Sequence, residues 1–419
     1  MTGTSNEKSN IRSARSVFSP LASRASLAHQ MAKTVRLGII GVGGMGATHA
    51  RLVLDGRVEG MQLTALADSS DPAARAPELA GIPAFPPGDA ILRSGLVDAV
   101  LIATPHYAHT TAGIAALKAG MHVLVEKPIS VHKADVQRLL AAHRGRSRQV
   151  FAAMFNQRTD PAFLRIRAMI TGGELGPLRR FAWTTTHWFR TEAYYASSRW
   201  RATWAGEGGG VLLNQCAHQL DMLQWLLGVP RRVRAFCRFG RHHAIEVEDD
   251  VTAYLEWKHG AHGVFIASTG ETPGANRLEI IGDRAQIVFE NDRLAITRNA
   301  VPAAEFCRSA PGPFDRPATT TETVPFPDRG GQHLAILQNF ADAIRHGAPL
   351  LAPAREGLHS VELANAMLLS TWTDRTLDLP IPATTYARHL QRRIRASSGL
   401  RKPAGRRLGA ADLAKSFAP

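Results

Sequence analysis

The segment GIIGVGGMGATHA limits the possible folds of this chain more than any other segment does. It places glycines at positions 41, 43 and 46 directly after the apolar run VRLGII and at the start of a helix-like stretch. Glycines at this spacing permit a tight strand-to-helix turn and let backbone N–H groups approach a pyrophosphate at the positive end of the helix. The segment therefore predicts a parallel α/β sheet that binds a dinucleotide. The residues that we expect to contact it in this turn are Gly41, Val42, Gly43, Gly44, Met45 and Gly46.

A second strand, QLTALAD, indicates which dinucleotide is bound. It ends on Asp68, which follows Gly46 by 68 − 46 = 22 residues. A carboxylate at this place accepts hydrogen bonds from the adenosine ribose hydroxyls and repels a 2′-phosphate. Ser69 and Ser70 follow, with no arginine beside them. We therefore expect NAD rather than NADP.

The pattern of strands and helices changes once along the chain. From Val35 to about Asn156, short apolar runs alternate with helix-length segments, which predicts a doubly wound parallel sheet of the Rossmann type. From about Arg179 to Val324, strands follow one another, which predicts a large, open antiparallel sheet. A chain of 419 residues is expected to form two domains. We place an NAD-binding domain at 34–155 and an α+β domain for substrate and oligomerisation at 156–385, with a helix near 355–372 that could return to the first domain.

The formal net charge of +15 is concentrated at the two ends. Residues 1–33 carry a net +4 and residues 386–419 a net +8, which leaves +15 − 12 = +3 for the middle. We expect a disordered basic extension over 1–33 and a basic tail over 386–419. Because the middle is nearly balanced, solvated tails are favoured over a nucleic-acid partner.

Membrane, export and metal signals are weak in this sequence. No apolar run reaches the ~20 residues that a membrane span needs, and the N-terminus has neither an apolar h-region nor a twin-arginine pair. Cys216, Cys237 and Cys307 are too few and too far apart for a disulfide framework or a zinc site. We expect a cytoplasmic protein without a metal ion.

The segment IATPHYAH places Thr104, Pro105 and His106 at the end of another parallel strand. Ligands of such sheets bind at the carboxyl ends of the strands. We therefore add these three residues and His109 to the expected cofactor contacts, although His109 also fits a local role at the start of a helix.

The segment HVLVEKP ends the next strand on Glu126 and Lys127. Pro128 biases Lys127 toward an extended backbone and could support a cis peptide. The ammonium of Lys127 would then point at a molecule beside the nicotinamide, and both Glu126 and Lys127 join the expected cofactor contacts. The alternative is that Lys127 only forms an ion pair with Glu126. This motif alone favours a catalytic role over that alternative only slightly.

The segment GEGGGVLLNQCAHQLDMLQWLLG predicts a helix with one polar face. With Asn214 at zero and about 100° per residue, His218 falls near about +40°, Asp221 near about −20° and Trp225 near about +20°. A leucine-rich stripe lies on the opposite side. Solvent-exposed faces more usually carry Lys, Glu and Gln, so this face predicts a substrate site. A partly exposed polar surface is the alternative.

Together, GVGGMG, TPHYAH, HVLVEKP, NQRTDP, GELGPLRR and GEGGGVLLNQCAHQLDMLQWLLG, in this order, resemble the Gfo/Idh/MocA family of sugar and cyclitol oxidoreductases. The resemblance runs from about Val35 to about Leu379. It implies a Rossmann domain, an open C-terminal sheet that commonly forms homo-oligomers, and a nicotinamide cofactor held between them.

The resemblance also implies roles for single residues. Lys127 takes the place of the family's catalytic lysine, and His218 that of the histidine acting as acid and base. Asp221 matches an aspartate that usually helps hold substrate, and Asn156 and Arg158 match an Asn-x-Arg motif, with Asn156 added to the cofactor contacts. The expected substrate contacts are Asn214, Asp221, Arg158, Trp200 and Arg201.

The sequence departs from the family at Asn214, where many members carry an aspartate. An amide can hold a hydroxyl but cannot take a proton or stabilise an imidazolium by charge. The favoured function is NAD-dependent oxidation or reduction at a secondary alcohol of a sugar, glycoside or cyclitol. An NAD-dependent glycosidase or lyase of the same fold is the first alternative, and a non-catalytic nucleotide-sensing regulator is the second.

Overall fold

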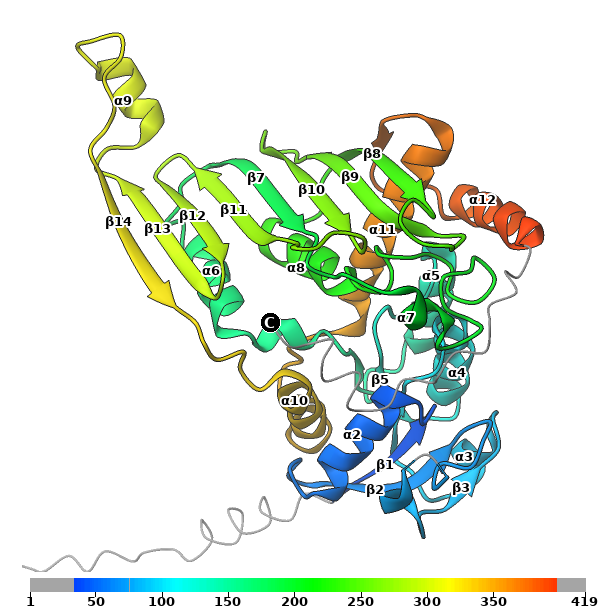
Figure 1. Ribbon diagram of the computed structural model, residues 1–419. Coiled ribbons are helices and arrows are strands. Elements are labelled where there is room, and N and C mark those ends of the chain that lie inside the picture. Colours follow the sequence, from blue (N-terminus) through cyan, green and yellow to red (C-terminus); the bar gives the residue numbers. More distant parts are fainter. Residues whose placement is uncertain (1–33, 75, 398–419) are drawn as a thin grey trace, which may run out of the picture. The chain divides into compact units, whose positions relative to one another are not determined.

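Two sheets form the framework of the chain (Figure 1). The computed structural model describes residues 34–74 and 76–397. Sheet A has six parallel strands in the order β3-β2-β1-β4-β5-β6. Sheet B has nine strands in the order β14-β13-β12-β11-β7-β10-β9-β8-β15.

Sheet A confirms the predicted doubly wound sheet. All residues of the central strand β4 are buried, as expected for a strand covered on both faces, and so are those of β6 at the edge of the sheet. Its strands are β1 (Val35–Ile40), β2 (Met61–Ala67), β3 (Ala84–Phe85), β4 (Ala99–Ile102), β5 (His122–Val125) and β6 (Phe151–Ala153). The helices between them are α2 (Gly44–Leu54), α3 (Ala90–Arg93), α4 (His106–Lys118) and α5 (Lys133–His143), with the 3-10 turn η1 (Pro77–Leu79).

Sheet B confirms the predicted open sheet, with one exception to its antiparallel pairing, because β7 and β10 run parallel. Burial alternates along β12, so one face of the sheet packs inward and the other is more exposed. The strands are β7 (Leu178–Thr185), β8 (Arg232–Phe239), β9 (Glu248–Glu256), β10 (His262–Ser268), β11 (Asn276–Gly282), β12 (Ala285–Glu290), β13 (Arg293–Asn299), β14 (Thr319–Pro325) and β15 (Leu377–Asp378).

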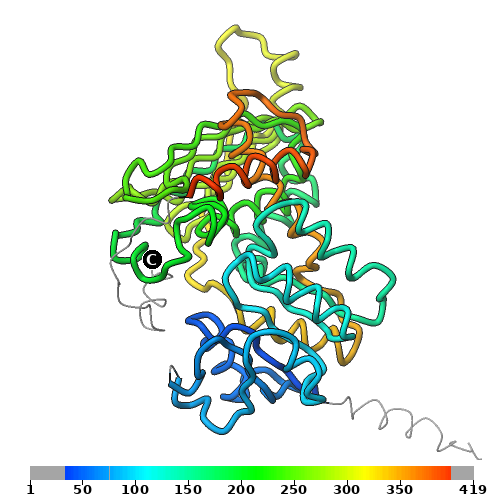
Figure 2. The backbone as a smooth tube through the Cα atoms, turned by 90° about the vertical axis from the view of Figure 1, so that its right-hand side faces the viewer, coloured from blue at the N-terminus to red at the C-terminus, as the bar shows by residue number. Residues whose placement is uncertain are grey.

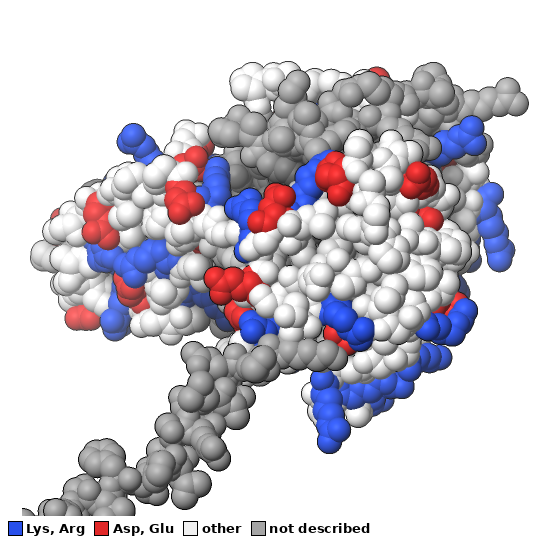
Figure 3. Space-filling view, turned by 90° about the horizontal axis from the view of Figure 1, so that it is seen from below, with Lys and Arg blue, Asp and Glu red and all other residues white. Residues whose placement is uncertain are grey.

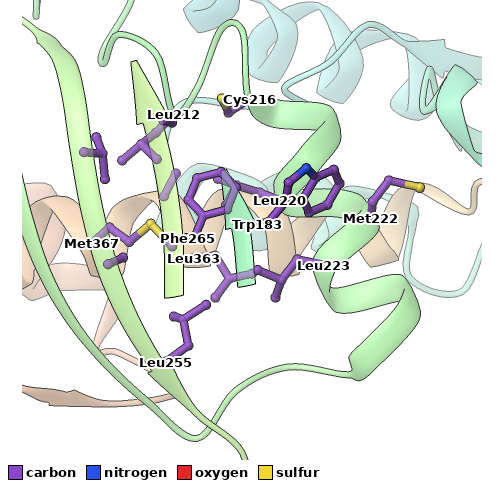
Figure 4. Close-up of a cluster of buried hydrophobic side chains, with 14 of the residues drawn as sticks. Trp183, Leu212, Cys216, Leu220, Met222, Leu223, Leu255, Phe265, Leu363 and Met367 are labelled. Atoms are coloured by element: carbon purple, nitrogen blue, oxygen red, sulfur yellow. The ribbon is translucent and has the colours of Figure 1, made fainter. Parts of the chain in front are cut away.

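Helices α6 (Pro161–Thr171), α8 (Ala217–Leu227) and α11 (Gly357–Thr373) belong to the core beneath sheet B. Figure 4 shows Leu220 and Leu223 of α8 facing Trp183 and Phe265 of the sheet. The leucine-rich stripe of the sequence is therefore the packing face of α8. The remaining elements are η2 (Asn156–Thr159), α7 (Glu192–Ala196), α9 (Ala303–Ser309), α10 (Gln332–His346), η3 (Ala354–Glu356) and α12 (Ala383–Ala396).

Helix α11 connects the two sheets, since it packs on β8 and also contacts α5. Lys133, at the start of α5, donates from its backbone nitrogen to Asn365 Oδ1 at 2.9 Å and from Nζ to Glu362 Oε1 at 2.5 Å. Both lysine and glutamate are buried. This helix occupies the region where a helix returning to the first domain was expected.

The C-terminal boundary differs from the prediction of a basic tail from residue 386. Helix α12 continues to Ala396 and lies next to α5 and α11 (Figure 2). Tyr386 and Leu390 are fully buried, and the Tyr386 ring stacks on Trp372 with the ring centres 5.4 Å apart. The arginines on its other side gave this amphipathic helix the composition of a tail. Residues 1–33 and 398–419 of the two predicted tails lie outside the described residues.

The surface agrees with the small net charge expected for the middle of the chain. On the face shown in Figure 3, Lys and Arg side chains lie interspersed with Asp and Glu. Within residues 34–74 and 76–397, every helix is too short or too polar to cross a membrane.

We expect Leu390→Ala to lower the free energy of unfolding by about 2–5 kcal/mol, because it leaves a cavity under α12. Urea unfolding followed by circular dichroism measures the change. Gln391→Ala, at an exposed position of the same helix, is the control and should change the value little. Equal stability of the two variants would mean that α12 does not pack as described.

Candidate active site

The glycine turn at the end of β1 has the shape that a dinucleotide requires. Gly41 has φ +91°, and a Cβ there would meet the backbone of Ala103 at 2.7 Å. A Cβ at Gly46 would collide with the carbonyl oxygen of Gly41, whereas a Cβ at Gly43 would meet nothing within 4 Å. The first and third glycines are thus required by the turn itself, and the second faces open space at the start of α2. A pyrophosphate fits against such a turn.

Asp68 lies beside this turn and is held on both of its oxygens. Oδ2 accepts a hydrogen bond from the backbone nitrogen of Val42 at 2.7 Å. Oδ1 accepts from the backbone nitrogen and the hydroxyl of Ser70 at 3.0 and 3.1 Å. The carboxylate is therefore fixed at the end of β2, where the ribose of NAD would lie. Together with the open face at Gly43, it shows that the residues present fit the cofactor.

The ends of β4 and β5 are tied together by a buried histidine. The two ring nitrogens of His109 lie 2.8 Å from the carbonyl oxygens of Thr104 and Pro128. His109 is in the first turn of α4, so its contacts are those of the local role that the sequence also allowed. Thr104 Oγ1 and Asn156 Oδ1, both expected to contact cofactor, are buried without a hydrogen-bond partner among the described residues. Such atoms are suited to bind a ligand.

Glu126 and Lys127 have different partners. The Lys127 ammonium donates to the backbone carbonyl of Asn214 at 3.0 Å, across to the segment that precedes α8. Glu126 accepts from His49 of α2, with 2.6 Å between Nε2 and Oε1, and from the backbone nitrogen of Lys127 at 3.0 Å. The peptide bond between Lys127 and Pro128 is cis. The Lys127 ammonium thus donates its hydrogen bond to Asn214 and not to the Glu126 carboxylate. Glu126 affects the ammonium through its negative charge.

Burial and neighbouring charges set the protonation of these groups. Burial would raise the pKa of Glu126, but the hydrogen bond and charge of His49 hold it at about 2. Burial lowers the pKa of Lys127, and the negative charge of Glu126 opposes this effect. The carboxylate stays ionised, and the ammonium of Lys127 depends on negative charges around it.

His218 is buried in the first turn of α8. Its pKa lies well below the ordinary value because the ring is desolvated and because the charge of Lys127 opposes protonation. The ring is thus neutral near pH 7 and can accept a proton. Nδ1 of His218 is buried without a hydrogen-bond partner in the described part of the chain. The carbonyl oxygen that binds the Lys127 ammonium belongs to Asn214, four residues before His218, so the structure brings the two residues into one site.

The helix itself begins later than predicted, at Ala217 rather than before Asn214. Residues 211–216 form turns, because backbone nitrogens of Val211 and Leu212 bind the carbonyl oxygen and the carboxylate of Glu248 in β9. The helical angle assigned to Asn214 is therefore wrong. Its position at the site comes from these turns instead.

Asp221 and Arg158, expected to hold substrate, bind each other. Arg158 donates from Nη2 and Nε to the two oxygens of Asp221 at 2.6 and 2.8 Å. Their side chains are only 1% and 0% exposed. Arg158 also binds Glu356 of η3 and lies against the Trp225 ring. A bidentate pair this deeply buried joins η2, α8 and η3, so the structure supports a positioning role for both residues.

Asn214, Trp200 and Arg201 line the side of the site that faces α7. Asn214 Nδ2 donates to Glu207 and, at 3.3 Å, to Tyr194 Oη. Arg201 Nη1 donates to the same phenol oxygen at 2.8 Å. The Trp200 ring meets the ring of His106, with 5.4 Å between the ring centres.

Sequence reasoning missed His49, Tyr194 and Glu207. His49 lies on α2 at helical spacing from the glycine turn, where a buried polar residue would have been a signal. Glu207 directly precedes the three glycines 208–210, and an isolated carboxylate in such a segment was a second signal. Tyr194 gave none, because its contacts are made only in the folded chain.

We expect Asp221→Asn to lower the free energy of unfolding by about 3 kcal/mol, since it leaves the Arg158 charge buried with a weaker partner. Chemical denaturation measures the loss. Glu174→Gln weakens partly exposed pairs with Arg165 and Arg298 and should cost less than about 1 kcal/mol. A stable Asp221→Asn variant that binds substrate poorly would instead restore the substrate-binding role.

We expect Asp68→Ala to weaken NADH binding by about tenfold or more while NADPH binding changes less, because the hydrogen bonds to ribose are lost and the repulsion of a 2′-phosphate is removed. Fluorescence titration with both nucleotides measures the change in preference. Asp71→Ala, at an exposed neighbouring position, is the control. An unchanged ratio of the two affinities would argue against this placement of the ribose.

Comparison with known proteins matches both halves of the chain. Residues 35–154 match the model of an oxidoreductase family with an NAD-binding Rossmann fold. Residues 163–288 match the model of the GFO/IDH/MocA C-terminal domain.

Inositol 2-dehydrogenase 1 from Saccharopolyspora erythraea is 30% identical over 204 residues, which cover 46% of this chain and 55% of the relative. The chain thus spans about half the length of the first curated relatives that it matches. Inositol 2-dehydrogenase from Rhizobium meliloti is 26% identical over 356 residues, which cover 83% of this chain and 99% of the relative.

The crystal structure of the WlbA dehydrogenase from Bordetella pertussis in complex with NADH and UDP-GlcNAcA is similar in fold. It has a TM-score of 0.70 and 24% identity, and the match covers 84% of this chain and 100% of that one. The two family models together match more than half of the residues, and the glycine turn and the two sheets agree with them. The chain belongs to the Gfo/Idh/MocA family of oxidoreductases.

Proposed function

We propose that the chain is an NAD-dependent oxidoreductase that oxidises a secondary alcohol, or reduces the corresponding ketone, on a small carbohydrate or cyclitol. The observation that carries the proposal is the meeting of Lys127 and His218 in one buried site. Lys127 binds the backbone carbonyl of Asn214, four residues before His218, and Glu126 ties the lysine segment to α2 and hence to the glycine turn.

The two residues suit the two demands of alcohol oxidation. The neutral imidazole of His218 takes the proton of the substrate hydroxyl. The ammonium of Lys127 donates a hydrogen bond to the same oxygen and stabilises the negative charge that develops on it. NAD, which the glycine turn and Asp68 would hold, would supply the acceptor for the hydride of the carbinol carbon. In the direction of reduction, His218 returns the proton to the oxygen.

The names of the relatives support the substrate class. Two are inositol 2-dehydrogenases, and the solved structure with a related fold holds a nucleotide-linked sugar acid. Trp200 and Arg201 lie at the edge of the site, where they can stack on a ring and bind its hydroxyls. The dehydrogenase is favoured over the glycosidase and the regulator for these reasons.

We also propose that the chain forms a homo-oligomer through the outer face of sheet B. Phe236, Tyr254 and Val264 lie on β8, β9 and β10 and are 54%, 40% and 37% exposed. Large apolar side chains gathered on one sheet face are typical of a protein interface. Light scattering of the wild type and of Phe236→Asp tests this assignment, and an unchanged mass would contradict it.

Incubation of the protein with NAD and a panel of monosaccharides, glycosides, anhydrosugars and inositols tests the proposed reaction. We expect NADH to accumulate together with an oxidised ring for at least one member. Release of an aglycone without accumulation of NADH would indicate the glycosidase instead.

Lys127→Met should lower turnover by about 100-fold or more, because the group that stabilises the oxyanion is lost. The affinity for NADH should change little. Lys118→Met removes an exposed lysine of α4 and serves as the matched control. Equal turnover of the two variants would remove Lys127 from the mechanism.

A further inference from the structure

Glu207 is a buried carboxylate within the candidate active site, and only 2% of the residue is exposed. Its Oε2 accepts a hydrogen bond from the backbone nitrogen of Ala202 at 2.5 Å, and its Oε1 accepts from Asn214 Nδ2. Its backbone carbonyl lies 3.2 Å from Nδ1 of His106, the first residue of α4. A buried carboxylate is costly unless it is bound to a donor or faces a positive charge.

Asn214 links this carboxylate to the Lys127 ammonium. The side-chain amide of Asn214 holds Glu207, while the backbone carbonyl of Asn214 accepts from Lys127 Nζ at 3.0 Å. One residue therefore fixes the positions of the two opposite charges. In agreement with this geometry, the charge of Glu207 favours the protonated form of Lys127 and so raises its pKa, against the larger effect of burial.

An amide is the side chain that this arrangement needs at position 214. Glu207 precedes Asn214 by 214 − 207 = 7 residues and offers an acceptor, so the side chain at 214 must donate. A carboxylate at 214 would place two negative charges at hydrogen-bond distance, which is unfavourable unless one takes up a proton. The carboxylate of Glu207 therefore explains why an amide, and not a second carboxylate, stands at position 214.

We propose that Glu207 supplies, from the sheet B side, the negative charge that faces the Lys127 ammonium, with Asn214 holding the two in place. Glu207 is then a positioning residue, which keeps Lys127 protonated in a buried site. This inference rests on the proposed role of Lys127 in the reaction.

Other groups also act on Lys127 and form the background of any pH measurement. Glu126 at the end of β5 is the second carboxylate. The cations are Arg190 and Arg201, and the groups whose own pKa values respond to Lys127 are His106, His109, Cys216, His218 and His333. Because Glu126 is bound to His49, a change at Glu207 alters the charge around Lys127 without breaking that contact.

Moving the carboxylate from one position to the other tests the proposal. Glu207→Gln removes the negative charge and leaves one acceptor oxygen for the two donors, the backbone nitrogen of Ala202 and Nδ2 of Asn214. Asn214→Asp alone sets two carboxylates together. The double variant Glu207→Gln with Asn214→Asp restores a donor, an acceptor and one negative charge beside Lys127, with the two roles exchanged.

The readout is the pH at which Lys127 becomes reactive toward acetic anhydride, followed by mass spectrometry of the labelled peptide, together with kcat/KM against pH. The chain has only eight lysines, so the peptide is readily assigned. For Glu207→Gln we expect the labelling midpoint and the alkaline limb of kcat/KM to move to lower pH, because the charge that favours the ammonium is gone. We also expect kcat/KM near pH 7 to fall by about tenfold or more. The double variant should recover most of both changes.

Glu362→Gln is the matched control, since it removes another buried carboxylate, which binds Lys133 at 2.5 Å, and should leave the labelling of Lys127 unchanged. A purely structural role of Glu207 would lower activity but leave the labelling midpoint of Lys127 in place, and this result overturns the proposal. A double variant that is folded by circular dichroism yet labels at a pH well below that of the wild type overturns it as well, even if Glu207→Gln alone fails to fold. Labelling needs no substrate, so an inactive wild type would refute the proposed function and still leave this inference open to decision.

Discussion

The hydrogen bond from the Lys127 ammonium to the Asn214 carbonyl is the contact on which the rest of the site depends. It joins the end of a strand in sheet A to the turns that precede α8 beneath sheet B. Strand β5 positions Lys127 from sheet A, and the backbone carbonyl of Asn214 binds its ammonium. Because the acceptor is a backbone atom, a side-chain substitution at position 214 does not remove it. Chemistry at this place therefore requires both halves of the chain, and neither sheet alone would form the site.

Burial favours the neutral form of both His218 and Lys127, which suits the histidine but not the lysine. The His218 ring is desolvated and lies near a cation, so it stays neutral and can accept a proton. The same burial works against the Lys127 ammonium, which therefore needs carboxylates nearby. Glu126 and Glu207 meet this need from the two sides of the site, each bound to a further residue that fixes it, His49 for one and Asn214 for the other. The electrostatics are thus set by pairs rather than by single residues.

The parts of the fold that were predictable from the sequence are those encoded locally. The glycine turn, Asp68 and the Glu126-Lys127 pair were found because strand ends of a parallel sheet meet at one edge. The late start of α8 was not predictable, since it depends on contacts with Glu248, more than thirty residues away. The pairing of Arg158 with Asp221, separated by 63 residues, was not predictable for the same reason. Helical periodicity predicts which face of a helix is polar, but not which distant charged side chain will bind to that face.

That buried pair also bears on how precisely the reacting groups can be held. Arg158 with Asp221, and Lys133 with Glu362, are ion pairs with almost no exposed surface. The first connects η2 with α8, and the second connects α5 with α11. Separating either pair would leave a charge in an apolar surrounding, which costs several kcal/mol. The two halves of the chain therefore resist sliding past each other at these points. Since catalysis depends on groups that are already in place, the pair at Asp221 bears on the reacting groups, because Asp221 lies on the same helix as His218, whereas the pair at Glu362 holds α11 to α5.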